Sequence, residues 1–262
     1  MDKPTVTTHI TPQGVATVTL DRPEKHNAFD DVVIAQLREA FGALARNDAV
    51  RAVVLASAGR NFSAGADLGW MQRMARYDHA HNLADARALA GMLQALYELP
   101  QPTLARVQGA AFGGAVGLVS CCDMAVASVD ASFALSEVRL GLVPATISPY
   151  VIRAIGERAA RRYFTTAERF GAQQALRLGL VSEVVETAQL DAAVKQLVDA
   201  LLDNGPVAVR AAKQLVAEVA GRSIDAALIE HTCERIAALR VSPEGQEGLG
   251  AFLEKRRPQW HV

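Results

Sequence analysis

The stretch that decides the fold runs Val107-Gln-Gly-Ala-Ala-Phe-Gly-Gly-Ala-Val-Gly-Leu-Val-Ser-Cys-Cys-Asp123. An apolar strand pattern at 103–107 leads into a glycine-rich turn, and a short apolar helix is expected after it. The turn contains Gly109, Gly113 and Gly114. The first N–H groups of a helix have no partner inside the helix, so they can hold a developing negative charge with the help of the helix dipole. The alternative is that the glycines only let the strand and the helix pack closely.

The chain before this stretch alternates between strand and helix patterns. Alternating runs at 6–10 and 15–20 predict an N-terminal hairpin. Asp30 is placed to cap a helix with apolar residues at helical spacing, and an apolar strand pattern follows at 51–57. A second helix is expected at 82–99. Because strands and helices alternate along the chain, we predict an α/β fold with parallel strands.

Beyond Gly156 the strand signal nearly disappears, apart from a short run at 180–185. Apolar stripes on the helices of this region, which include Ile224 and Ile236, fit either the core or a contact with another subunit. The sequence alone leaves both readings open. The helices are expected at 157–167, 172–178, 187–203, 206–220, 223–239 and 243–255.

Composition limits the function classes. The chain has 262 residues, half of them hydrophobic, which is enough for one large domain or a domain with an appendage. Its formal net charge of −1 and the lack of a basic run argue against nucleic-acid binding. We expect a cytoplasmic protein, because no apolar run is long enough to span a membrane and residues 1–4 do not begin a signal peptide. The three cysteines and six histidines are not spaced as metal ligands, so no metal is expected.

Two further segments resemble known motifs. They are Asn61-Phe-Ser-Ala-Gly-Ala-Asp-Leu68 and Ser136-Glu-Val-Arg-Leu-Gly-Leu-Val-Pro144. Together with the glycine-rich stretch, and with 22–28 and 251–257 near the two ends, they resemble the enoyl-CoA hydratase/isomerase (crotonase) superfamily along the whole chain.

The resemblance implies an α/β fold with a crotonase-like ββα spiral core and a C-terminal helical trimerisation region, which we expect at 1–200 and 201–262. It also implies an acyl thioester of coenzyme A as substrate, a homotrimer or a hexamer, no cofactor apart from the coenzyme A of the substrate, and no nucleic-acid or membrane partner.

The resemblance also implies roles for individual residues. By matched position, the backbone N–H groups of Ala66 and Gly114 would form an oxyanion hole, and Glu137 would be the catalytic acid or base. The apolar residues around Glu137 predict a carboxyl pKa raised by burial. Asp67 is also expected to hydrogen-bond a turn or cap a helix. Further substrate contacts are implied for Ala64, Asp67, Leu68, Gly113, Pro144 and Tyr150, and coenzyme A contacts for Lys25, Phe252 and Lys255.

The sequence departs from the best-known hydratases at Gly117, where they carry a second glutamate. Isomerases of the family also work with one glutamate, so Δ3,Δ2-enoyl-CoA isomerisation is an alternative. A finer resemblance of the three segments is to the bacterial methylglutaconyl-CoA and carboxygeranoyl-CoA hydratases of leucine and acyclic-terpene breakdown. It predicts hydration of a branched enoyl-CoA whose own distal carboxylate orders the attacking water. An RNA-binding or scaffold role is the alternative of another class, and the balanced charge argues against it.

Overall fold

The computed structural model describes residues 4–261. The expectation about a signal peptide depends on residues 1–3, which lie outside the described range. Within that range, no helix combines the length and the apolar character needed to cross a membrane.

The larger sheet has six strands in the order β1-β2-β3-β4-β6-β9. Strands β1 and β2 pair antiparallel, as the predicted hairpin requires, and the other neighbours pair parallel. Gly14 makes the hairpin turn possible because its φ of +83° lies in the left-handed region. The strands are β1 (Val6–Ile10), β2 (Val15–Leu20), β3 (Ala52–Ser57), β4 (Thr103–Val107), β6 (Met124–Ser128) and β9 (Glu183–Val185).

A second sheet has three short strands in the order β5-β7-β8, which lie between strands of the larger sheet along the chain. Its strands are β5 (Ala110–Phe112), β7 (Ser132–Ala134) and β8 (Phe170–Gly171). Strand β5 leads directly into α4 (Gly114–Cys121), and β7 ends shortly before Glu137. Because β5 and β7 pair with each other, the glycine turn after β5 and the candidate glutamate after β7 lie close together.

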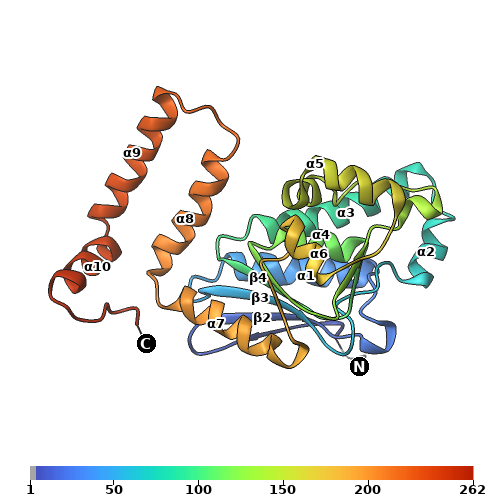
Figure 1. Cartoon of the computed structure of the whole chain (residues 1–262), viewed down its shortest axis with the longest axis horizontal. Helices are drawn as coiled ribbons and strands as arrows, with labels where there is room; N and C mark the ends of the chain where they lie inside the picture. Colours follow the sequence, from blue (N-terminus) through green and yellow to red (C-terminus); the bar gives the residue numbers. More distant parts are fainter. Residues whose placement is uncertain (1–3, 262) are drawn as a thin grey trace.

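Helices cover both faces of the larger sheet (Figure 1). Alternate residues of β3 point to opposite sides: Val53 and Leu55 join the main core, whereas Val54 belongs to a smaller cluster with Val194 of α7. Helices α1, α3 and α4 supply much of the main core. Asp30 caps α1 by accepting from the Val33 N–H, as predicted. Besides α4, the helices of the core are α1 (Asp31–Ala45), α2 (Leu68–Met74), α3 (His79–Tyr97), α5 (Ser148–Thr166), α6 (Ala172–Leu178) and α7 (Leu190–Leu202), with 3-10 turns η1 (Pro23–Lys25), η2 (Glu137–Leu140) and η3 (Thr187–Gln189).

The last three helices form an arm that extends away from the core (Figure 1). They are α8 (Pro206–Val219), α9 (Ala226–Val241) and α10 (Pro243–Leu253). Side chains of α8 hold the base of the arm: Lys213 lies 2.7 Å from Asp123, and Arg210 lies 3.1 Å from Asp48. Further along, the arm buries little, and Ile224 is 86% exposed. The chain thus leaves an apolar surface on the arm uncovered.

Several expected boundaries were wrong. The helix expected at 157–167 begins at Ser148 and bends at Gly156, where φ is +76°. The prolines and polar residues at 144–149 resemble a turn, so the first half of the helix was not predicted. A proline is nevertheless tolerated in the first turn of a helix. Helix α2 and the three short strands were not predicted, since segments of two to seven residues carry little periodicity. The α/β fold itself is confirmed.

Candidate active site

Backbone pairing joins the loop after β3 to strand β5. The Ser63 N–H donates to the Ala110 carbonyl at 2.9 Å, and the Phe112 N–H donates to the Ser63 carbonyl at 3.0 Å. The Asn61 side chain adds a third bond by accepting from the Ala110 N–H at 3.0 Å. These bonds bring Ala66, which ends the loop, close to the glycine turn that follows β5.

Phe29 connects the two halves of this arrangement. Its N–H donates to the Gly65 carbonyl at 2.8 Å, and its carbonyl accepts from the Asp67 N–H at 2.7 Å. Its ring lies against Gly114, where an added Cβ would be 3.4 Å from two ring carbons. Phe29 is itself buried, so it fixes the peptide around Ala66 relative to the start of α4.

The backbone N–H groups of Ala66 and Gly114 are the candidate oxyanion donors. Gly114 is the first residue of α4, and Ala66 pairs with Phe29 only through its neighbours. Within residues 4–261, neither N–H donates a hydrogen bond. Two unpaired donors at a half-open surface, one of them at the positive end of a helix, can stabilise an oxyanion.

Glu137 lies beside these donors. A Cβ added to Gly113 would be 3.3 Å from the Glu137 Oε1 atom. The other carboxylate oxygen, Oε2, is buried and has no hydrogen-bond partner among the described residues. Burial raises the pKa of the Glu137 carboxyl, as the sequence predicted. A carboxyl group of raised pKa can both accept and return a proton near neutral pH.

The position of the missing second carboxylate is filled by packing. A Cβ added to Gly117 would lie 2.3 Å from the Ile147 Cγ2 atom and 3.4 Å from a methyl group of Leu93. Both Ile147 and Leu93 are buried. The structure therefore has no room for a glutamate at 117 unless Ile147 moves or is smaller.

Ala64, Asp67 and Leu68, the other predicted residues of this loop, flank Ala66 in the chain. Asp67 caps α2 by accepting from the Gly69 and Trp70 N–H groups, which confirms its expected structural role. Although burial works against it, the hydrogen bonds from the Trp70 backbone and from Lys25 hold the pKa of Asp67 below its usual value. Lys25 lies 3.4 Å from the Asp67 carboxylate. Ala64 and Leu68 are exposed, with Leu68 at 75%.

Pro144 and Tyr150 belong to the segment that follows η2 in the chain. Pro144 is buried. Tyr150 packs against Tyr97 with ring centroids 5.1 Å apart, and burial, followed by the neighbouring Cys121, raises its pKa. Since Cys121 ends α4 and Gly114 begins it, Tyr150 lies at the opposite end of this helix from the glycine turn.

Phe252 and Lys255 are not part of this cluster. Both follow or end α10, and Phe252 is 81% exposed. Figure 1 shows α10 at one end of the molecule and α2, next to Ala66 and Lys25, at the other. The chain does not bring these two residues to its own candidate site.

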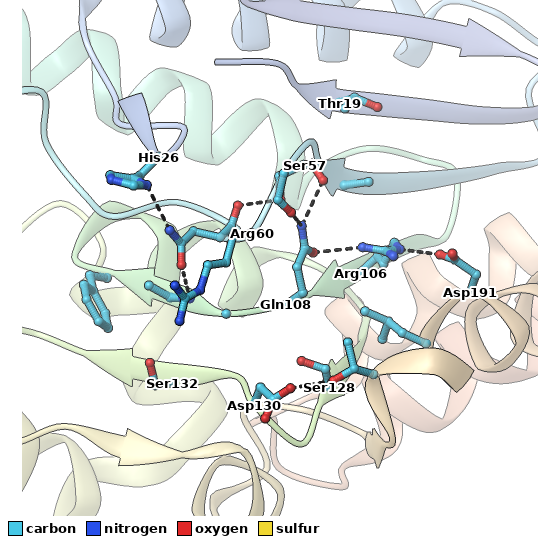
Figure 2. A pocket seen from close by; sticks show the side chains of 18 of the residues that line it. Thr19, His26, Ser57, Arg60, Arg106, Gln108, Ser128, Asp130, Ser132 and Asp191 are labelled. Carbon is cyan, nitrogen blue, oxygen red and sulfur yellow. Dashed lines mark hydrogen bonds and ion pairs between the residues drawn. The ribbon is translucent and has the colours of Figure 1, made fainter. Parts of the chain in front are cut away.

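A cavity of about 1160 Å³ lies next to the same loop, but it is not lined by Glu137, Ala66 or Gly114. Figure 2 shows the polar network inside it. The Gln108 side-chain amide donates to the carbonyls of Ser57 and Gly59, and its oxygen accepts from Arg106, which in turn pairs with Asp191. These hydrogen bonds hold the loop after β3 against the residue that follows β4, and they use both the amide nitrogen and the oxygen of Gln108.

Sequence reasoning missed Phe29 and Arg22. Phe29 carries no chemical signal, because an apolar residue before a helix cap is common in any core. Arg22 stood in the loop segment that carried the family resemblance, but nothing in its spacing indicated a partner. Among residues 4–261, no group of three or more His, Cys, Asp or Glu side chains is placed to hold a metal ion.

Comparison with known proteins gives consistent results. The family model for enoyl-CoA hydratase/isomerase matches residues 10–262. The 2,3-dehydroadipyl-CoA hydratase of Escherichia coli is 33% identical over 95% of this chain and 95% of its own. The crystal structure of an enoyl-CoA hydratase from Shewanella pealeana is 50% identical, with a TM-score of 0.94 over 98% of this chain and 96% of that one. An enoyl-CoA hydratase from Mycobacterium smegmatis is 36% identical, with a TM-score of 0.93 over 99% and 100%.

Proposed function

Since this chain belongs to the enoyl-CoA hydratase/isomerase family, we propose that it hydrates a branched, carboxylated enoyl-CoA at the cluster of Ala66, Gly114 and Glu137. The chain is an enzyme of the enoyl-CoA hydratase type, a hydro-lyase, and hydratases of this family need no cofactor. The observation that carries the proposed site is the pair of N–H groups on Ala66 and Gly114, unpaired within residues 4–261, beside the half-buried carboxylate of Glu137.

The two N–H groups bind the thioester oxygen of the substrate. When water adds to C3, the electrons of the double bond move toward the carbonyl, and the oxygen gains negative charge. The N–H groups of Ala66 and Gly114 donate to no acceptor within residues 4–261, so they need not break other bonds to receive this charge. Removing one donor of this kind typically costs about 3–4 kcal/mol of transition-state stabilisation.

Glu137 moves the protons. Its carboxylate takes a proton from water as the water oxygen bonds to C3, and it then returns that proton to C2 of the enolate. One carboxylate can thus serve as base and then as acid, with no net change in its charge. The raised pKa of Glu137 suits both halves of this cycle. The same steps in reverse give dehydration.

A distal carboxylate on the substrate supports the single-glutamate mechanism. Ile147 fills the space beside Gly117, so the protein supplies no second carboxylate there to order the water. An acid group on the substrate itself would take that part. The name of the Escherichia coli relative supports this class of substrate, because 2,3-dehydroadipyl-CoA is the thioester of a dicarboxylic acid. These grounds favour a carboxylated enoyl-CoA, and the resemblance of the three segments makes 3-methylglutaconyl-CoA the first candidate.

The arm of α8–α10 is assigned to oligomerisation, with 201–262 as a region distinct from the core. Its exposed apolar residues, such as Ile224 and Val241, need a partner surface. In a homotrimer or a hexamer, Phe252 and Lys255 of one subunit would reach the coenzyme A of a neighbour, where Lys25 binds the same phosphates. Sedimentation equilibrium tests the assembly, and a monomer at working concentration would contradict it.

The test is the loss of enoyl-thioester absorbance when the purified protein meets 3-methylglutaconyl-CoA. We expect rapid loss, and a drop in kcat on the order of 10²- to 10⁴-fold in Glu137→Gln. An unchanged rate in the variant would overturn the proposed role of Glu137. No loss with the wild-type protein, combined with turnover of a 3-enoyl-CoA to a 2-enoyl-CoA, would show an isomerase instead.

A further inference from the structure

The oxyanion donor on Ala66 is followed directly by a carboxylate. The Asp67 side chain is 12% exposed, and its Oδ1 atom accepts from the Gly69 N–H at 2.8 Å and the Trp70 N–H at 3.1 Å. An ionised carboxylate next to a group that must hold negative charge repels that charge unless cations neutralise it. The charges around Asp67 therefore affect the stabilisation of the oxyanion, and they also affect the start of α2.

Two cations contact Asp67, and they differ in burial. The Arg22 Nη2 atom lies 3.6 Å from the Asp67 Oδ2 atom, with the Arg22 side chain only 11% exposed. Lys25 lies 3.4 Å from the same oxygen, but its side chain is 53% exposed. Solvent and salt screen an exposed charge more than a buried one. Lys25 is hydrogen-bonded to Asp67 and lowers its pKa, whereas Arg22 is the cation whose charge solvent and salt screen less.

Arg22 also connects two helix caps. Its Nη1 atom lies 2.5 Å from Asp30, whose other oxygen caps α1, while its Nη2 atom faces Asp67, which caps α2. Phe29 lies between these caps and is bonded on both sides to the Ala66 loop. Asn27 holds the Arg22 backbone in turn, accepting from its N–H and donating to its carbonyl, each at 2.9 Å. The guanidinium is therefore held in one place.

We propose that Arg22 is a positioning residue for the reaction: it neutralises Asp67 and holds the Ala66 N–H in the direction of the thioester oxygen. The inference rests on the proposed role of Ala66 as an oxyanion donor. The hydrogen bond from the Ala66 N–H to the thioester oxygen strengthens as negative charge develops in the transition state. Replacing Arg22 weakens this hydrogen bond, so it lowers kcat more than it raises KM.

The first test is Arg22→Met, measured on whichever enoyl-CoA the protein hydrates fastest. We expect kcat to fall about 10- to 100-fold, with KM changed by less than about two-fold. The matched control is Arg51→Met. Arg51 is another partly buried arginine that donates to three carbonyls, those of Leu202, Asn204 and Trp260, at the opposite end of β3 from the site. The control should lose thermal stability and keep its kcat.

The second test separates charge neutralisation from folding. Asparagine caps a helix as well as aspartate, so Asp67→Asn removes the charge and keeps the cap of α2. The kcat loss caused by Arg22→Met should shrink in the Asp67→Asn background, which a double-mutant cycle measures. Arg22→Lys keeps the charge but reaches one carboxylate only, and it should recover part of kcat. If the methionine variant does not fold, the lysine variant is compared in the two backgrounds.

Equal kcat for Arg22→Met and Arg51→Met would overturn the inference, as would the same loss with and without Asp67. Glu137→Gln is measured alongside. Should that variant keep full activity, the proposed role of Glu137 fails, while the Arg22 cycle still reports on the Ala66 donor. The two proposals can therefore fail separately.

Discussion

Gly113 and Glu137 face each other so closely that a single added carbon on Gly113 would lie 3.3 Å from the Glu137 Oε1 atom. Gly113 also caps the helix that begins with the oxyanion candidate Gly114. The backbone of one residue thus sets both the distance to the carboxylate and the direction of the N–H group.

Replacing Gly113 by alanine should damage both functions. Gly113 has φ +54° and ψ −119°, a region that L-residues avoid, so the strain should cost about 1–3 kcal/mol of unfolding free energy. The new methyl group would also press on Glu137, and kcat should fall at least about 10-fold. Gly171→Ala is the control, because Gly171 has φ −87° and open space around its Cβ position. Identical melting curves and rates for the two variants would refute this account.

The half-buried carboxyl group of Glu137 should make stability depend on pH. Its folded pKa is raised, so the fold favours the protonated form. The unfolding free energy of the wild type is therefore highest below the ordinary glutamate pKa, and it falls as pH rises through the folded pKa. The total decrease is about 1.4 kcal/mol for every pH unit between the unfolded and the folded pKa. Glu137→Gln should be more stable than wild type at neutral pH and equal to it in acid. Urea titrations across pH measure the difference, and a gap that stays constant with pH would contradict the raised pKa.

The pH dependence of kcat/KM should report the same raised pKa of Glu137. The base form of Glu137 is required to accept the proton of water, so kcat/KM should rise with pH along an acid limb that lies above the usual glutamate range. An acid limb at the ordinary glutamate value would mean that another group controls the rate.

The contact between Gly117 and Ile147 should limit what position 117 accepts. A Cβ there would overlap the Ile147 side chain, so Gly117→Ala should cost about 1–3 kcal/mol through overpacking. Adding Ile147→Ala should recover part of that loss, because the two residues share one space. Thermal melts of the two single variants and the double variant give the coupling. Simple additivity would show that the strain is relieved elsewhere.

A substrate carboxylate that orders the attacking water should be required for turnover. Replacing the distal carboxylate of 3-methylglutaconyl-CoA by its methyl ester should reduce kcat by at least about 10-fold, since the water loses its second hydrogen-bond partner. Crotonyl-CoA, which lacks the group altogether, serves as the comparison. Unchanged turnover of the ester would remove this part of the proposal.

Much of the fold follows from local patterns in the sequence. The N-terminal hairpin, the cap at Asp30 and the apolar strand at 52–57 depend on residues close together in the chain, and each formed where the pattern predicts. The N–H of Gly114, which has no acceptor among the described residues, also follows from sequence, because the first residue of any helix lacks a partner inside the helix. The raised pKa of Glu137 was expected from its apolar neighbours.

The meeting of these parts could not be predicted from spacing. Ala66 lies beside Gly114 only because Ser63 pairs with β5 and Phe29 packs between them, and no local pattern indicates either contact. Arg22 reaches Asp67 for the same reason. The sequence by itself determined which segments could supply donors and a carboxylate, because helix starts and apolar surroundings are local properties. Only the tertiary structure decided their distances, because these depend on pairing and packing between segments far apart in the chain.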